Sequence, residues 1–180
     1  MEKRGQTLFS AKTAYVPDLA AASPWILRWA HLVSRGTVLD VACGGGRHSR
    51  LFLEKGLKVL AVDRDRQSIP GARVVQADLE NGSPWPFAGE RFEAIVVTNY
   101  LHRPLFPHIV ESLAGGGILL YETFMLGNER FGRPSNPAFL LRPGELLEAF
   151  RSLRPLAFEE GEVCEPKPAM LQRLCAENAA

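Results

Sequence analysis

The sequence predicts an α/β fold, a doubly wound and mostly parallel sheet of seven strands with an antiparallel strand at its C-terminal edge. Short apolar segments rich in Val and Ile alternate with helical patterns, as in sheets covered by helices on both faces. The last two strand segments are joined only by CEPKP (164–168). That connection is too short for a parallel crossover, so these two strands should be antiparallel. The chain of 180 residues is expected to form a single domain over 1–180.

The strands follow from continuous apolar runs. They are predicted, in chain order, at residues 37–42, 58–63, 72–78, 92–98, 117–124, 155–163 and 169–177. The segment RDRQSIPG (64–71) between the second and third strands has room for about one helical turn. We therefore expect one crossover helix to be nearly absent.

The helices are marked by their ends. The first begins with Ser23 as N-cap and Pro24 at the first helical position, and Gly36 is expected to stop it. The other helical patterns are RHSRLFLEKG (47–56), LFPHIVESLAGGG (105–117) and PGELLEAFRSL (143–153).

Composition and charge argue against several classes of protein. Hydrophobic residues make up 46% of the chain and charged residues 23%, which is typical of a soluble globular domain. A formal charge of +1 argues against a protein whose main task is to bind phosphate backbones. No apolar run is long enough to span a bilayer and the N-terminal segment lacks the apolar core of a signal peptide. Three cysteines without a CxxC pair favour a reducing cytoplasm, and no metal site is predicted.

Three consecutive glycines, Gly44–Gly46, lie between the first strand and the following helix. In doubly wound sheets, ligands bind beyond the carboxyl ends of the strands, and a helix N-terminus there attracts an anion. A dinucleotide pyrophosphate and the carboxylate of an amino-acid-like cofactor are both compatible with this loop. A tight turn without a ligand is the simpler alternative.

Acidic residues at three strand ends distinguish between the two anions. The dinucleotide fingerprint would have Ser49 in place of its third glycine, and Asp40 would repel a pyrophosphate but suits a ligand with an ammonium group. Asp63, at the end of the second strand, could accept hydrogen bonds from a ribose diol. Asp78 is placed for an adenine amino group, with Leu79 against the ring. Each carboxylate alone could cap a turn, but together they indicate S-adenosyl-L-methionine.

With these residues the chain, over roughly 23–178, resembles class I S-adenosylmethionine-dependent methyltransferases, which have a Rossmann-like fold. VLDVACGGGRHS (38–49) resembles the first glycine motif of the family, with Ala42 where glycine is usual. Asp63 matches the ribose-binding acid and ADL (77–79) the adenine-binding motif. LAGGGILLYE (113–122) resembles the turn before the fifth strand. The CGGGRHS form is most similar to small bacterial tellurite-resistance and thiopurine-type methyltransferases, which says little about the substrate.

The resemblance implies a set of cofactor-binding residues. Arg47, after the glycines, is placed to pair with the cofactor carboxylate or to be a solvated residue of the first helical turn. The implied set is Asp40, Ala42, Gly44, Gly46, Arg47, Asp63, Arg64, Ala77, Asp78, Leu79 and Asn99.

The resemblance also places TNYLHRP (98–104) opposite the transferring methyl group. Asn99 and Tyr100 would contact the methionine part, with the Tyr100 ring facing the sulfonium. His102 is the predicted general base, unless it packs under the next helix. These assignments make Tyr100 and His102 the predicted catalytic residues. Glu122 is a further titratable group at a strand end, more simply explained by a salt bridge.

The substrate side is less defined. The irregular segment 125–143 could form a lid, and its Arg130, Arg133 and Arg142 could bind an anionic substrate. Alternatively, these arginines pair with Glu129, Glu145 and backbone carbonyls. The extension 1–22 could cover the other side of the active site through Phe9 or Tyr15.

The function expected from these features is the methylation of a small molecule, with transfer by in-line displacement. A nucleic-acid or protein methyltransferase and a non-catalytic S-adenosylmethionine-binding protein remain alternatives. No membrane partner is expected, and the protein should be a monomer or a homodimer.

Overall fold

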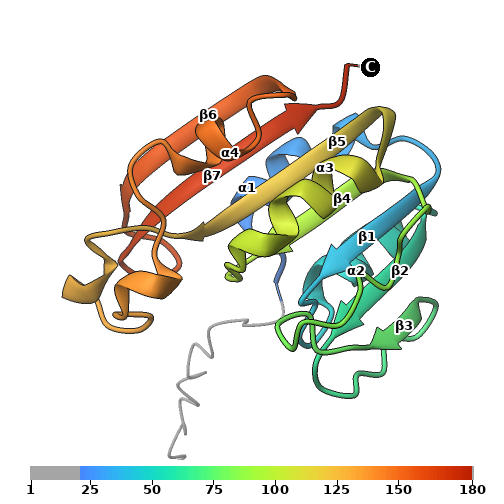
Figure 1. Ribbon diagram of the computed structural model, residues 1–180, viewed down its shortest axis with the longest axis horizontal. Helices are drawn as coiled ribbons and strands as arrows, with labels where there is room; N and C mark the ends of the chain where they lie inside the picture. The colour runs from blue at the N-terminus through green and yellow to red at the C-terminus, as the bar shows by residue number, and fades with distance from the viewer. Residues whose placement is uncertain (1–20, 180) are drawn as a thin grey trace, which may run out of the picture.

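A computed structural model describes residues 21–179 and shows one twisted sheet with helices on both faces (Figure 1). The strand order is β3-β2-β1-β4-β5-β7-β6. Neighbours among β1 to β5 pair in parallel, whereas β7 pairs antiparallel with β5 and β6. The predicted fold class and the reversed C-terminal edge are confirmed. The strands are β1 (Thr37–Val41), β2 (Lys58–Asp63), β3 (Arg73–Gln76), β4 (Phe92–Thr98), β5 (Leu113–Phe124), β6 (Arg154–Val163) and β7 (Ala169–Glu177).

Helices are short. They are α1 (Pro24–Trp29), η1 (Ala30–Leu32), α2 (Arg47–Glu54), η2 (Arg103–Leu105), α3 (Phe106–Ser112), η3 (Asn128–Arg130), η4 (Pro137–Phe139) and α4 (Glu145–Ala149). The Ser23 side chain caps α1 by accepting from the Trp25 N–H at 3.1 Å, as predicted. The prediction that this helix runs on to Gly36 is wrong, because after Trp29 the chain tightens into the 3₁₀ turn η1. No helix in the described range is long and apolar enough to cross a membrane.

Several strand boundaries also differ from prediction, two of them by two residues or more. The third strand ends at Gln76 instead of continuing to Asp78, and Ala77 bonds back to the Asp63 carbonyl at 2.9 Å. This leaves Ala77 and Asp78 in a loop beyond the sheet, where they can face a ligand. The fifth strand begins at Leu113, four residues before the predicted start at 117, because Leu113 already pairs with Phe92 across a register shift.

The core has two halves, one on each face of the sheet. One half packs α3 and α4 against alternate strand residues such as Leu39 and Ile95. The other packs α1 and α2 against the intervening ones, such as Val38. This alternation places opposite faces of β1 in separate cores, as expected for a strand buried on both faces.

The half of the sheet around β3 has little helical cover. Residues 64–72 contain no helix, as predicted, and neither does the 77–91 connection. In this loop the buried Trp85 and Phe87 pack edge to face at 5.1 Å, and Trp85 donates to the Ser112 hydroxyl at 2.9 Å. Two aromatic side chains therefore cover the sheet where a crossover helix would usually lie.

Candidate cofactor and active site

The glycine loop follows β1 at the carboxyl edge of the sheet. Ala42, Gly44 and Gly46 have left-handed backbones, with φ of 52°, 50° and 75°. A side chain at Gly46 would also place its Cβ 2.5 Å from a methyl carbon of Ile69, so both space and conformation require glycine there. At Gly44 and Gly45 a Cβ would meet no atom within 4 Å. The loop is therefore packed on one side and open on the other.

Asp40 lies beneath this loop and is only 1% exposed. Its carboxylate accepts a hydrogen bond from the Ser49 hydroxyl at 2.6 Å. Burial raises the pKa of Asp40 to about 6, although the Ser49 bond opposes the shift. Ser49 replaces the third glycine of the dinucleotide motif, and the structure gives it this partner. A buried carboxylate of this kind is stabilised by any cation that binds nearby.

Asp63 ends β2 and faces the same loop. One carboxylate oxygen accepts from the Gly44 N–H at 2.8 Å and the other from the Asp65 N–H at 2.9 Å. Each oxygen keeps a further lone pair for a ligand hydroxyl. Asp63 therefore shapes the glycine loop as well as being available to a diol, while the neighbouring Arg64 is exposed.

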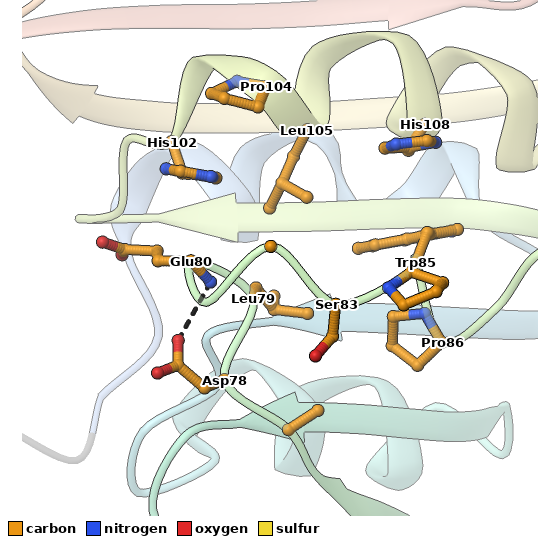
Figure 2. A pocket seen from close by; sticks show the side chains of 13 residues that line it. Asp78, Leu79, Glu80, Ser83, Trp85, Pro86, His102, Pro104, Leu105 and His108 are labelled. Carbon is orange, nitrogen blue, oxygen red and sulfur yellow. Dashed lines mark hydrogen bonds between the residues drawn. The ribbon is translucent and has the colours of Figure 1, made fainter.

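A cavity of about 490 Å³ opens beside the end of β3 (Figure 2). Its lining residues are Ala77, Asp78, Leu79, Glu80, Gly82, Ser83, Pro84, Trp85, Pro86, His102, Pro104, Leu105 and His108. Asp78 accepts from the Glu80 N–H at 2.9 Å, and the Trp85 and His108 rings stack at 5.9 Å. The cavity brings together the predicted adenine residues and His102. It does not include the glycine loop or Asp63, so the predicted cofactor residues form two groups along one sheet edge.

The segment after β4 is fixed by its backbone. Asn99 has a left-handed φ of 54° and donates its N–H to the Glu122 carbonyl at 2.9 Å. The Tyr100 carbonyl accepts from the buried Tyr121 hydroxyl at 3.0 Å. Burial, and then the nearby Glu80 carboxylate, raises the pKa of Tyr100 above its ordinary value. Tyr100 thus keeps its phenolic proton, whereas His102 is half-buried and lines the cavity.

The three loop arginines differ in their contacts. Arg130 lies 3.5 Å from Glu162, and Arg142 lies 3.4 Å from Glu145 and 3.5 Å from Glu148. Arg133 is exposed and has no hydrogen-bond or ion-pair partner among residues 21–179. The expected alternative, pairing with Glu129, Glu145 and backbone carbonyls, holds for Arg142 with Glu145 and for Arg130, which donates to the Gly127 carbonyl at 3.1 Å. The carboxylate partner of Arg130 is Glu162 instead of Glu129.

Sequence reasoning missed the residue that fastens this loop. Arg103 donates from Nε and Nη2 to the buried Glu145 carboxylate at 2.6 and 3.0 Å. It also donates to the Ala138 and Leu140 carbonyls at 2.9 and 3.0 Å. These contacts join the segment after β4 to the second half of the substrate loop. No sequence signal pointed to Arg103, because its partners lie 35 to 42 residues away.

Glu122 pairs with Arg173 at 2.6 Å, which agrees with the salt bridge expected as its simpler role. Phe9 and Tyr15, proposed for the N-terminal cover, lie outside the described residues. Of the extension, the structure describes only 21 and 22, and the Ala21 carbonyl accepts from Arg47 at 3.4 Å.

Known proteins share this architecture. TehB from Haemophilus influenzae superposes with a TM-score of 0.65 at 19% identity, over 85% of this chain and 61% of TehB. The 1,6-didemethyltoxoflavin-N1-methyltransferase of Burkholderia thailandensis, solved with 1,6-didemethyltoxoflavin and S-adenosylhomocysteine, gives 0.61 at 21% identity over 87% and 76%. The chain thus spans less than two thirds of TehB.

A curated relative matches a shorter stretch. The ribosomal RNA small subunit methyltransferase H of Gemmatimonas aurantiaca is 48% identical over 42 residues, 23% of this chain and 13% of that protein. By contrast, a family model described as a methyltransferase domain matches residues 13–177, which is nearly the whole chain. The sheet order, the glycine loop and this match agree: the chain belongs to the methyltransferase domain family.

Proposed function

We propose that this enzyme methylates a small molecule by in-line displacement from S-adenosyl-L-methionine. The observation that carries the cofactor assignment is that the open glycine loop, Asp63 and the Asp78 cavity follow one another along one sheet edge. The cofactor carboxylate would lie at Gly44, Gly46 and Arg47, and the ammonium group near Asp40. N–H donors at a helix N-terminus suit the cofactor carboxylate, and a buried carboxylate suits the ammonium group.

The remaining cofactor contacts follow the sheet edge. Asp63 and Arg64 would hold the ribose, and Asp78 would accept a hydrogen bond from the adenine amino group. Ala77 and Leu79 would contact the adenine ring inside the cavity. Asn99, and Ala42 under the loop, would border the methionine part. This order is supported by the register, which places the ends of β1, β2 and β3 side by side.

The chemistry depends mainly on placing the acceptor in line with the bond that breaks between sulfur and methyl. Tyr100 would face the sulfonium as a neutral phenol, where its ring stabilises positive charge. His102 would accept a proton from an acceptor whose nucleophilic atom carries one. Both residues lie in the segment fixed by Arg103 and Tyr121.

The acceptor would carry a negative charge. Arg133 supports this, because it remains unpaired within residues 21–179 while Arg130 and Arg142 contact carboxylates. Phe131 and Phe139, on the same loop, are exposed and would contact an apolar part. In this proposal 125–143 forms the substrate wall or lid, and 1–22 the opposite cover, of a monomeric or homodimeric cytoplasmic enzyme. The free Cys43, Cys164 and Cys175 are consistent with a reducing compartment.

A nucleic-acid methyltransferase is the second candidate, favoured by the short match to the ribosomal RNA enzyme. The formal charge of +1 weighs against it, since phosphate-backbone binding usually requires a basic surface. The charge distribution of the loop, one unpaired arginine instead of a cluster, favours a small anion.

Two experiments test the proposal. A thermal-shift panel of S-adenosylmethionine, S-adenosylhomocysteine, NAD and FAD should show stabilisation by the first two only, by about 2.7 kcal/mol at a hundred times the dissociation constant. No shift at millimolar concentration would remove the cofactor assignment. Incubation with methyl-labelled cofactor and cell extract should then label the small-molecule fraction. Label in RNA or protein instead would favour the second candidate, and tight binding without label a non-catalytic role.

A further inference from the structure

A buried histidine joins three parts of the molecule behind the glycine loop. His48 lies in the first turn of α2 and is 1% exposed. Its Nε2 lies 3.2 Å from the backbone N–H nitrogen of Ser23, which caps α1. Its Nδ1 lies 3.2 Å from the hydroxyl of Thr98, the last residue of β4. The imidazole therefore touches the start of α1 and the start of the segment that leads to Tyr100.

The partners of His48 determine its protonation. A backbone N–H can only donate, so Nε2 must carry a lone pair. The proton of a neutral ring is then on Nδ1, where the Thr98 hydroxyl oxygen can accept it. In a charged imidazolium Nε2 would also carry a proton, so two N–H donors would face each other at Ser23 and no hydrogen bond could form. Burial, and then the adjacent Arg47, lowers the pKa of His48 to about 3, in agreement with a neutral ring.

Residues 21 to 23 are held at the glycine loop by a second contact. Arg47 donates to the Ala21 carbonyl at 3.4 Å, next to the bond from Ser23 to His48. Two consecutive residues of α2 thus fasten the chain that leads into the N-terminal extension. The Arg47 side chain is partly exposed, so solvent and ligand can compete for its bond to Ala21, whereas the His48 contact is buried.

We propose that His48 is a positioning residue which, as the neutral Nδ1-protonated tautomer, locks the N-terminal segment and the end of β4 to the cofactor loop. It does not touch the cofactor. It acts by fixing Ser23 beside the glycines and Thr98 before Asn99, so both walls of the site keep their place when the cofactor binds. This role depends on the cofactor assignment proposed above.

The first test observes the ring directly. Long-range ¹H–¹⁵N spectra of the full chain should show His48 with a protonated Nδ1 and an unprotonated Nε2, unchanged between about pH 5 and 8, because a typical histidine would titrate near 6.5. The Ser23 amide should exchange slowly with solvent. An Nε2-protonated ring, or titration near 6.5, would overturn the proposal whether or not any variant folds.

The second test uses two substitutions that each retain one contact. In His48→Gln the amide oxygen can reach the Ser23 N–H in place of Nε2, whereas in His48→Asn the amide can replace only Nδ1 at Thr98. S-adenosylhomocysteine affinity, measured by calorimetry, should fall about three- to tenfold in each variant, because each loses one of the two hydrogen bonds that position the site. Ser23 exchange should accelerate only in the Asn variant.

Controls separate this role from general destabilisation. His31→Asn changes an exposed histidine whose Nδ1 contacts the Arg28 carbonyl, and it should bind as the wild type does. A purely structural role would lower the melting temperatures of the Gln and Asn variants but leave the affinity of the folded protein unchanged, so wild-type affinity in both variants would overturn the positioning role. If the wild type itself fails to bind S-adenosylhomocysteine, the proposed function fails instead, and the tautomer and Ser23 exchange still report whether the junction exists.

Discussion

Replacing Asp40 with asparagine should stabilise the fold relative to wild type as the pH rises, and should at the same time weaken cofactor binding. The carboxyl is 1% exposed, and within residues 21–179 its side-chain hydrogen-bond partner is Ser49. Its pKa is raised from 3.8 to about 6 by burial. The folded state therefore holds a proton that the unfolded chain has lost between these two values. Stability is full below 3.8 and is lost as the pH rises through 6.

The shift sets the size of the effect. About two pKa units correspond to about 3 kcal/mol, of which about 2 kcal/mol is lost between pH 4.5 and 7.5. The Asp40→Asn variant does not lose this stability as the pH rises, because asparagine does not ionise. The change in the difference between the two proteins matters more than its absolute value, because a buried amide has hydrogen-bond costs of its own that do not vary with pH.

Urea unfolding of both proteins at several pH values measures this difference. The advantage of the variant should grow by about 2 kcal/mol over that range. Calorimetry at neutral pH should show S-adenosylhomocysteine binding weakened about tenfold or more, because the ammonium group loses a nearby charge. Glu90→Gln, which removes an exposed carboxylate, should change neither. Parallel pH profiles would refute the buried-charge argument, and unchanged affinity would refute the ammonium assignment.

Other substitutions test the remaining contacts. Asp63→Ala should weaken cofactor binding by about 1.5–3 kcal/mol in calorimetry and slightly lower the melting temperature, since the Gly44 N–H also loses its acceptor; unchanged affinity would show that Asp63 does not bind the ribose. Arg133→Ala should raise the acceptor KM or lower turnover with cofactor affinity constant, whereas early melting with normal kinetics would make the loop purely structural. Glu145→Gln should lower the unfolding free energy by about 1–3 kcal/mol in urea, because Arg103 loses its carboxylate, and a smaller loss would contradict that network.

The sequence alone determined the order of elements and which polar residues lie along one sheet edge. Apolar runs of strand length, the Ser23 cap and the glycines after the first strand are local signals, since each depends on residues a few positions apart. The connections between these elements imply that the strands are parallel. Parallel strands in turn place Asp63 next to the glycine loop. The resemblance to methyltransferases rested on the same local residues.

Only the tertiary structure decided which polar groups are paired and which remain available. Arg103 and Glu145 are 42 residues apart, and Thr98 and His48 are 50 apart. Such pairs depend on strand order and helix packing, which no local pattern encodes. Packing between distant elements also explains three other features: Asp40 is buried, Trp85 covers β3, and Arg133 has no partner within the described chain. The sequence therefore predicted which kinds of residue lie at this site. Their protonation, partners and exposure depend on how the sheet and the helices pack together.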